Sequence, residues 1–160
     1  EIDIGKITYQ IQFSKLHEKR MEIIEETYFK VVNLNINLQD YMSPFQQSKS
    51  GKQENFDSEQ KEKQQKAFDS YNELKMFYNN KKLFFNESTK VKMEDLLKTI
   101  RAKIWDFTSA ERMKSYGANH NDLIAEYKKR NDASDYVFEE IPKMLTALEK
   151  DLQKMIGVES

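Results

Sequence analysis

The chain has 160 residues, 33% of them charged, with 4 Gly, 2 Pro and no Cys. So few turn-forming residues argue against a β-rich fold, and the length suits one domain with a sizeable core. Without Cys there are no disulfides, no thiolate catalysis and no Cys-based zinc site.

The formal net charge is −1, with 11 basic and 13 acidic residues in 1–80 and 15 and 14 in 81–160. Neither half has the basic excess of proteins that bind a phosphate backbone. No apolar run reaches the ~18–20 residues of a membrane span. The absence of Cys fits a cytoplasmic domain, which is the location we expect. Because the sequence starts at Glu1 rather than Met, we also expect further residues upstream of Glu1. A segment among these residues could tether the domain to a membrane.

The first element is predicted to be a helix from Lys6 to Met42, ended by Ser43-Pro44 because the residue before proline avoids the helical region. At ~1.5 Å per residue it would be about 55 Å long and would need partners of similar length. Its bulky residues recur every three or four positions, as on the buried face of a bundle helix. Two heptad rows hold Gln10, His17, Ile24, Val31 and Leu38, and Phe13, Arg20, Thr27, Leu34 and Tyr41.

The segment 46–56 is predicted to be a flexible surface loop, because Gln46 to Asn55 contains no apolar residue. Asp57 and Gln60 have the spacing of a capping pair for a second helix, which would end near Phe85-Asn86. The apolar face of this helix would contain Ala67, Tyr71, Leu74 and Tyr78.

A third helix is predicted to start at a cap formed by Asn86 or Ser88 and to stop at Gly117. Thr108-Ser-Ala-Glu111 has the pattern of another capping box, which predicts a break or bend near Phe107. Trp105 lies off the apolar stripe, so we expect it to be partly exposed. That stripe contains Met93, Leu96, Leu97, Ile100, Ile104 and Phe107.

The last segment is periodic enough for one helix from Asn121 to Ile156, bent at Pro142, which removes one backbone hydrogen bond. A break within 131–135, giving two shorter helices, stays open. The predicted fold is an all-α, elongated, mostly antiparallel bundle of four principal helices, with the first and last the longest. It would form a single domain over residues 1–160.

Catalytic and metal-binding patterns are incomplete in this sequence. His17-Glu18 could begin a zinc-binding His-Glu-x-x-His motif, but the position of the second histidine is occupied by Met21. The Glu-x-x-His motif of di-metal bundles is missing too, because Ser14 precedes His17 and Gly117 precedes His120 at that spacing. There is no Gly-x-Ser-x-Gly and no glycine-rich phosphate loop. We therefore expect neither an enzyme nor a resident metal or cofactor.

The third helix carries basic residues close to Trp105, and aromatic residues among basic ones can support stacking on single-stranded nucleic acid. Acidic residues interrupt this patch, so nucleic-acid binding is only an alternative. The basic residues are Lys90, Lys92, Lys98, Arg101 and Lys103, and the acidic ones are Glu87, Glu94, Asp95 and Asp106.

His17 and Arg20 occupy positions on the apolar stripe where Leu or Ile is expected. The simplest interpretation is that their stems lie at the edge of the stripe and their polar ends reach solvent or a carboxylate. If the start of the first helix lies beside the end of the last, paired residue numbers sum to about 161, which places Arg20 near Pro142. Arg20 or His17 would then hydrogen-bond the backbone or a carboxylate around this kink. The candidate polar seam comprises His17, Arg20, Thr27, Asn131 and Ser134.

Two terminal segments resemble uncharacterised bacterial helical proteins. One is Phe13-x-x-Leu-His-Glu-Lys-Arg20 followed by Ile23-Ile-Glu-Glu-x-Tyr28, and the other is Ile141-Pro-Lys-Met-Leu followed by Ile156-Gly-Val-Glu159. In such proteins this helix often follows an N-terminal coiled coil, sometimes with a membrane anchor. The resemblance implies architecture and context but no activity.

Two functions follow as expectations. The first is a non-enzymatic helical interaction or scaffold domain that binds a protein partner or itself. The second is a regulatory or effector domain that binds a ligand or nucleic acid, either in a polar pocket at His17 and Arg20 or on the basic face of the third helix. The sequence identifies no small-molecule ligand.

Overall fold

The computed structural model describes residues 4–43, 53–115 and 119–157. Within these ranges the chain forms four α-helices and one short 3-10 helix, and no strand. The elements are α1 (Ile4–Met42), α2 (Gln53–Lys81), η1 (Lys82–Phe84), α3 (Glu87–Ser115) and α4 (His120–Met155). The all-α bundle of four helices predicted from the sequence is therefore confirmed.

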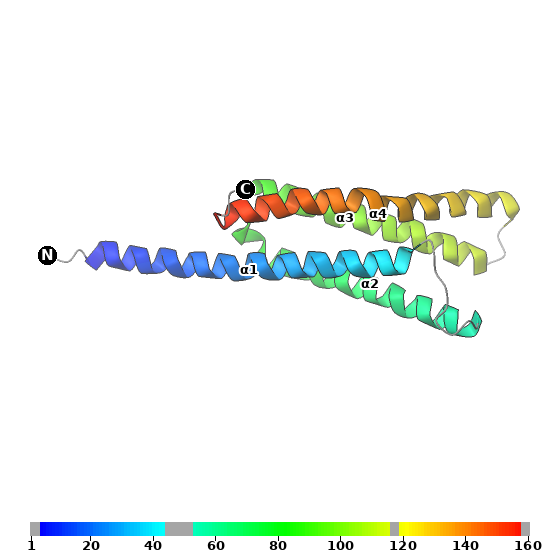
Figure 1. The fold of residues 1–160 in the computed structure, drawn as a ribbon, viewed down its shortest axis with the longest axis horizontal. Helices are drawn as coiled ribbons and strands as arrows, with labels where there is room; N and C mark the ends of the chain where they lie inside the picture. The colour runs from blue at the N-terminus through cyan, green and yellow to red at the C-terminus, as the bar shows by residue number, and fades with distance from the viewer. Residues whose placement is uncertain (1–3, 44–52, 116–118, 158–160) are drawn as a thin grey trace.

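The helices pair closely as α1 with α2, α1 with α4 and α3 with α4 (Figure 1). The start of α1 extends alone past the other helices at one end of the molecule (Figure 1). At the opposite end, the start of α2 lies away from the end of α1 (Figure 1).

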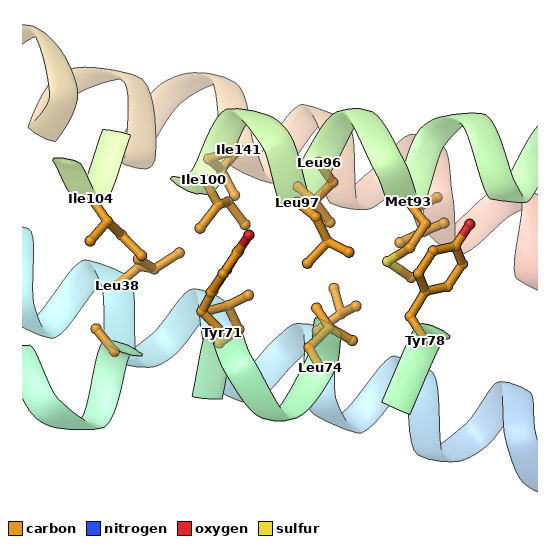
Figure 2. Packing of buried hydrophobic residues seen from close by; sticks show 14 of the residues in the cluster. Leu38, Tyr71, Leu74, Tyr78, Met93, Leu96, Leu97, Ile100, Ile104 and Ile141 are labelled. Atoms are coloured by element: carbon orange, nitrogen blue, oxygen red, sulfur yellow. The ribbon is translucent and has the colours of Figure 1, made fainter. Parts of the chain in front are cut away.

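The core is a single layer of apolar side chains between the helices. In Figure 2, Tyr71, Leu74 and Tyr78 of α2 face Met93, Leu96, Leu97 and Ile100 of α3, while Leu38 of α1 and Ile141 of α4 complete the same cluster. All nine are less than 9% exposed, and fully burying a side chain of this size contributes about 1.5–3 kcal/mol. The apolar stripes predicted for the second and third helices are thus the faces that the fold buries.

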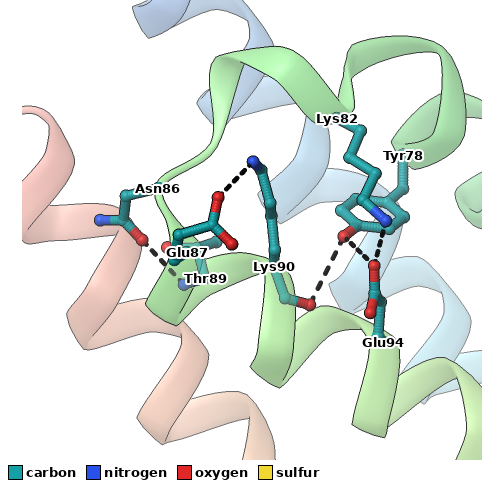
Figure 3. A network of polar contacts seen from close by, with 7 residues as sticks. All are labelled: Tyr78, Lys82, Asn86, Glu87, Thr89, Lys90 and Glu94. Atoms are coloured by element: carbon teal, nitrogen blue, oxygen red, sulfur yellow. Dashed lines mark hydrogen bonds and ion pairs between the residues drawn. The ribbon is translucent and has the colours of Figure 1, made fainter.

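The corner between α2 and α3 is fixed by polar contacts (Figure 3). Asn86 accepts the Thr89 backbone N–H at 2.8 Å and caps α3, as predicted. Lys82 pairs with Glu94, and the Tyr78 hydroxyl donates to the same carboxylate at 3.1 Å. Hydrogen bonds from Lys82 and then Tyr78 hold the pKa of Glu94 below its usual value. This corner holds the end of α2 against the start of α3.

Two predicted helix boundaries are wrong. α2 begins at Gln53, so 53–56 belong to a helix rather than to a loop, and Asp57 lies inside the helix rather than at its cap. α3 runs without a break to Ser115, and the Thr108 hydroxyl, predicted to cap a new helix, instead bonds the Tyr41 hydroxyl at 3.2 Å. Residues 46–52 and Gly117 lie outside the described ranges.

The last helix is continuous from His120 to Met155 through Pro142, which confirms the single-helix alternative. The Thr146 hydroxyl donates to the Pro142 carbonyl at 3.0 Å. Asn119 caps the start of α4 by accepting the Asp122 backbone N–H at 3.0 Å. Gly157, with φ of 76°, donates its backbone N–H to Lys154 at 3.2 Å and terminates the helix in the left-handed conformation that glycine tolerates.

Candidate functional site

The free part of α1 follows from the register of its two neighbours. Lys30 pairs with Glu73 at 2.5 Å and Asp40 with Lys63 at 3.0 Å, so residue numbers on α1 and α2 sum to 103. This sum places Lys81, the last residue of α2, opposite Glu22.

The same argument holds for α4. The Ser134 hydroxyl donates to the Met42 carbonyl at 2.6 Å, so residue numbers on α1 and α4 sum to about 176. This sum places Met155, the last residue of α4, opposite Met21. Both neighbours therefore end at the same level, and 4–22 of α1, hereafter the arm, continues past them. The arm is about 28 Å long.

One row of side chains runs along α1 from the core onto the arm. In the bundle its members are 0–4% exposed; they are Ile23, Thr27, Val31, Leu34, Leu38 and Tyr41. On the arm the same three- and four-residue spacing continues through Arg20, Leu16, Phe13 and Tyr9. Leu16 is 51% exposed, Phe13 61% and Tyr9 68%, and the Phe13 and Tyr9 rings stack with centroids 6.4 Å apart. The arm thus carries the pattern of a buried helix face without a covering helix.

The structure places the predicted polar seam differently from the sequence arithmetic. Paired numbers on α1 and α4 sum to about 176 rather than 161, an offset of fifteen residues or about 22 Å along a helix. Ser134 is buried and bonds Met42, not a group near Thr27. Thr27 is also buried, but its hydroxyl donates to the Ile23 carbonyl at 2.6 Å in its own helix.

The predicted contact of Arg20 or His17 with the Pro142 kink is wrong for the same reason. Pro142 instead shares a hollow of about 200 Å³ with Asn35. His17 lies exposed on the arm, and Asn131 lies exposed on α4. Arg20 is half-buried where the arm leaves the bundle, and its buried Nε has no hydrogen-bond acceptor in the described structure.

A groove of about 880 Å³ lies between α2 and α3. Its lining combines basic residues of both helices with aromatic rings and one carboxylate. These residues are Lys75, Lys98, Arg101 and Arg112, then Phe68, Tyr71 and Trp105, and Asp106.

Positive charge dominates this groove. Lys75, Lys98 and Arg101 make no ion pair with any residue that the structure describes. Burial raises the pKa of the Tyr71 phenol, and the charge of Arg101 opposes that increase, so the guanidinium lies within electrostatic reach of the ring. Trp105 is 67% exposed, which confirms the expectation from the sequence.

Lys98, Arg101 and Trp105 belong to the basic face predicted for the third helix, and the fold brings these three together at the groove. Lys90 and Lys92 are used elsewhere, because they pair with Glu87 at 2.7 Å and Asp151 at 2.7 Å. Lys103 lies over the Tyr136 ring of α4 at 4.6 Å. Lys75 and Tyr71 of α2 form the second wall of the groove. The sequence did not predict this wall, because no pattern in it gives the register of α2 against α3.

Within the described ranges, no group of three or more His, Asp or Glu side chains is arranged to hold a metal ion. None of the helices described is both long and apolar enough to cross a membrane. Comparison with protein-family models, curated proteins and solved structures found no match to this chain. The resemblance of the terminal segments to uncharacterised bacterial helical proteins therefore stays an expectation.

Proposed function

We propose that the chain is a non-enzymatic helical interaction domain that pairs with a second copy of itself through the arm of α1. The observation that supports this proposal is the unbroken row from Tyr41 to Tyr9, buried over its second half and exposed over its first. An exposed apolar row of this kind marks an interaction surface in a water-soluble helix.

The partner element is a helix. The row repeats at intervals of three and four residues, and a second helix is the element whose side chains interlock with such a row. Within the bundle this role belongs to α2 and α4. On the arm, an added helix would continue the bundle in the same geometry.

A second arm fits in antiparallel orientation. If paired numbers sum to 29, Phe13 meets Leu16 of the other copy, and Tyr9 meets Arg20. The guanidinium of Arg20, whose Nε has no acceptor in the described structure, then lies on an aromatic ring, where a cation is attracted. Each arm overlaps the other from residue 7 to residue 22.

Charge and length agree with this register. The charged residues of the arm are Lys6, Lys15, Glu18, Lys19, Arg20 and Glu22, and none of them lies opposite a like charge when paired numbers sum to 29. Ile7 lies opposite Glu22, at the level where α2 and α4 of the other copy end, and Ile4 extends three residues beyond that level. The two bundles therefore lie at opposite ends of the overlapped arms and do not meet.

The test compares two phenylalanines of α1 that are equally exposed. Phe13 lies on the row and is 61% exposed, whereas Phe29 lies off the row and is 62% exposed. Light scattering after size-exclusion chromatography should give twice the 19.1 kDa chain mass for the unaltered protein and for Phe29→Glu. Phe13→Glu should give a monomer, because it buries a charge in the centre of the paired arms.

A monomeric unaltered chain across the accessible concentration range would refute the proposal. Equal loss of the dimer in both variants would also refute it, because the row would then not be the contact. Circular dichroism of each variant, with unchanged helix content and melting, shows that the substitutions act on association and not on folding.

A further inference from the structure

The groove between α2 and α3 is lined by positively charged side chains that take no part in the proposed pairing of the arms. Lys75 comes from α2 and Lys98 and Arg101 come from α3, so cations line both walls. No carboxylate of the described residues pairs with any of the three. By contrast, Lys82, Lys90 and Lys92, nearer the corner, each have an acidic partner.

The arrangement on α3 is regular. Lys98, Arg101, Trp105 and Arg112 lie at intervals of three, four and seven residues, which places them on one face of the helix. Trp105 also lines a second hollow of about 190 Å³, so open space borders the indole in two directions. A planar group could stack on this ring while its charged end reaches the cations.

We propose that this groove binds a nucleoside phosphate, with the base stacked on Trp105 and the phosphates held by Lys98 and Arg101 of α3 and Lys75 of α2. Arginine binds phosphate oxygens in a bidentate manner, and lysine serves as a point charge. A volume of about 880 Å³ lies within the range of small-molecule sites.

Two features favour a small nucleotide over a nucleic-acid strand. Lys75, Lys98 and Arg101 line a single hollow, whereas a strand needs a basic track that follows its backbone. The chain as a whole carries a formal charge of −1, so it gains little from releasing counterions along a strand. Asp106, at the Trp105 end of the lining, would repel phosphate there, which favours the orientation with the phosphates toward Lys98 and Arg101.

The protein provides its own reporter, because Trp105 is the single tryptophan. Titration with adenosine triphosphate should quench its fluorescence with a saturable curve. Adenosine and inorganic tripolyphosphate should each bind at least about tenfold more weakly, since each supplies only half of the contacts. A single-stranded oligothymidylate of matched phosphate content serves as the strand probe.

Variants assign the contacts. Arg101→Gln should weaken nucleotide binding by about tenfold or more, as expected for loss of a charge-assisted hydrogen bond. Lys150→Gln removes the same charge from an exposed site on α4, outside the groove, and should leave the affinity unchanged. Trp105→Ala, followed by calorimetry, should bring the affinity for adenosine triphosphate down to that for tripolyphosphate.

Equal affinity for tripolyphosphate and adenosine triphosphate would overturn the proposal, because the ring would then contribute nothing. Binding of the oligothymidylate alone, or equal effects of Arg101→Gln and Lys150→Gln, would overturn it as well. None of these readouts depends on the arm, so Phe13→Glu protein should bind the nucleotide as the unaltered chain does.

Discussion

At the scale of single residues, the carboxylate of Asp151 links α4 to α3. It is 7% exposed, accepts a hydrogen bond from the Ser88 hydroxyl at 2.5 Å and pairs with Lys92 at 2.7 Å. Burial alone would raise the pKa of Asp151, but the hydrogen bonds from Lys92 and Ser88 outweigh burial and hold the pKa below its usual value. Ser88, one of two predicted caps of the third helix, thus joins two helices instead.

We predict that Asp151→Asn lowers the free energy of unfolding by about 1–3 kcal/mol, since the amide leaves Lys92 without its buried partner. A carboxyl with a lowered pKa stabilises the fold above its unfolded pKa and stops doing so as pH falls through its folded pKa. The unaltered protein should therefore lose more stability than the variant when the pH drops below about 4. Urea unfolding at neutral and acidic pH measures both effects.

Asp132→Asn is the matched control, because Asp132 is exposed on the same helix and has no ion pair among the described residues. It should change the free energy of unfolding by less than about 0.5 kcal/mol. Equal effects of the two substitutions would show that the contacts of Asp151 contribute nothing of their own.

The sequence identified the polar residues of the stripe but not their partners. The spacing correctly placed Thr27 and Ser134 on buried faces, because periodicity reports which side of a helix is covered. It misplaced the pairing by fifteen residues, because the arithmetic assumed that the first and last helices start and end level. That offset depends on where α2 and α4 end, which no residue of α1 encodes.

At the scale of elements, α1 contains two different environments in one uninterrupted helix. Its heptad pattern and lack of proline predicted the helix to within two residues of its observed start at Ile4. The same pattern could not tell the arm from the core, because both carry bulky residues at the same spacing. Only the ends of the neighbouring helices separate them.

Because one part of α1 is covered and the other is not, truncating a row residue in the bundle should change the free energy of unfolding more than truncating one on the arm. Leu34→Ala should lower the free energy of unfolding by about 2–5 kcal/mol, since Leu34 is 1% exposed and leaves a cavity. Phe13→Ala should change it by less than about 0.5 kcal/mol when the protein is dilute enough to be monomeric. Chemical denaturation followed by circular dichroism gives both values. A loss at Phe13 as large as that at Leu34 would show that the arm packs against its own bundle.

At the scale of the whole molecule, stability should vary along α1. Isolated helices of about 19 residues are marginal in water, so amides of the arm are expected to exchange with protection factors on the order of 10 or less. Amides from Ile23 to Tyr41, whose row is buried, should exchange only on global unfolding. Hydrogen exchange read by mass spectrometry of the dilute protein measures the gradient.

Uniform protection of α1 in the monomer would contradict this expectation. At high concentration, where the arms pair, protection should spread from Ile23 toward Ile7 while the remaining helices keep their pattern. The composition alone pointed to the helical bundle, but the protection gradient along α1 depends on where α2 and α4 end beside it, which the composition does not give.

Once paired, the arms would form a rigid spacer, because no proline or glycine interrupts α1 between Lys6 and Met42. In the proposed pair, the two bundles lie at opposite ends of the overlapped arms, about 22 Å apart from Glu22 to Glu22. The groove-lining part of α2, Phe68 to Lys75, lies level with 28–35 of α1, so the two grooves would be held at a fixed separation greater than about 22 Å. A ligand or surface that displays two suitable groups at the separation of the grooves would be held far more tightly than one that displays a single group.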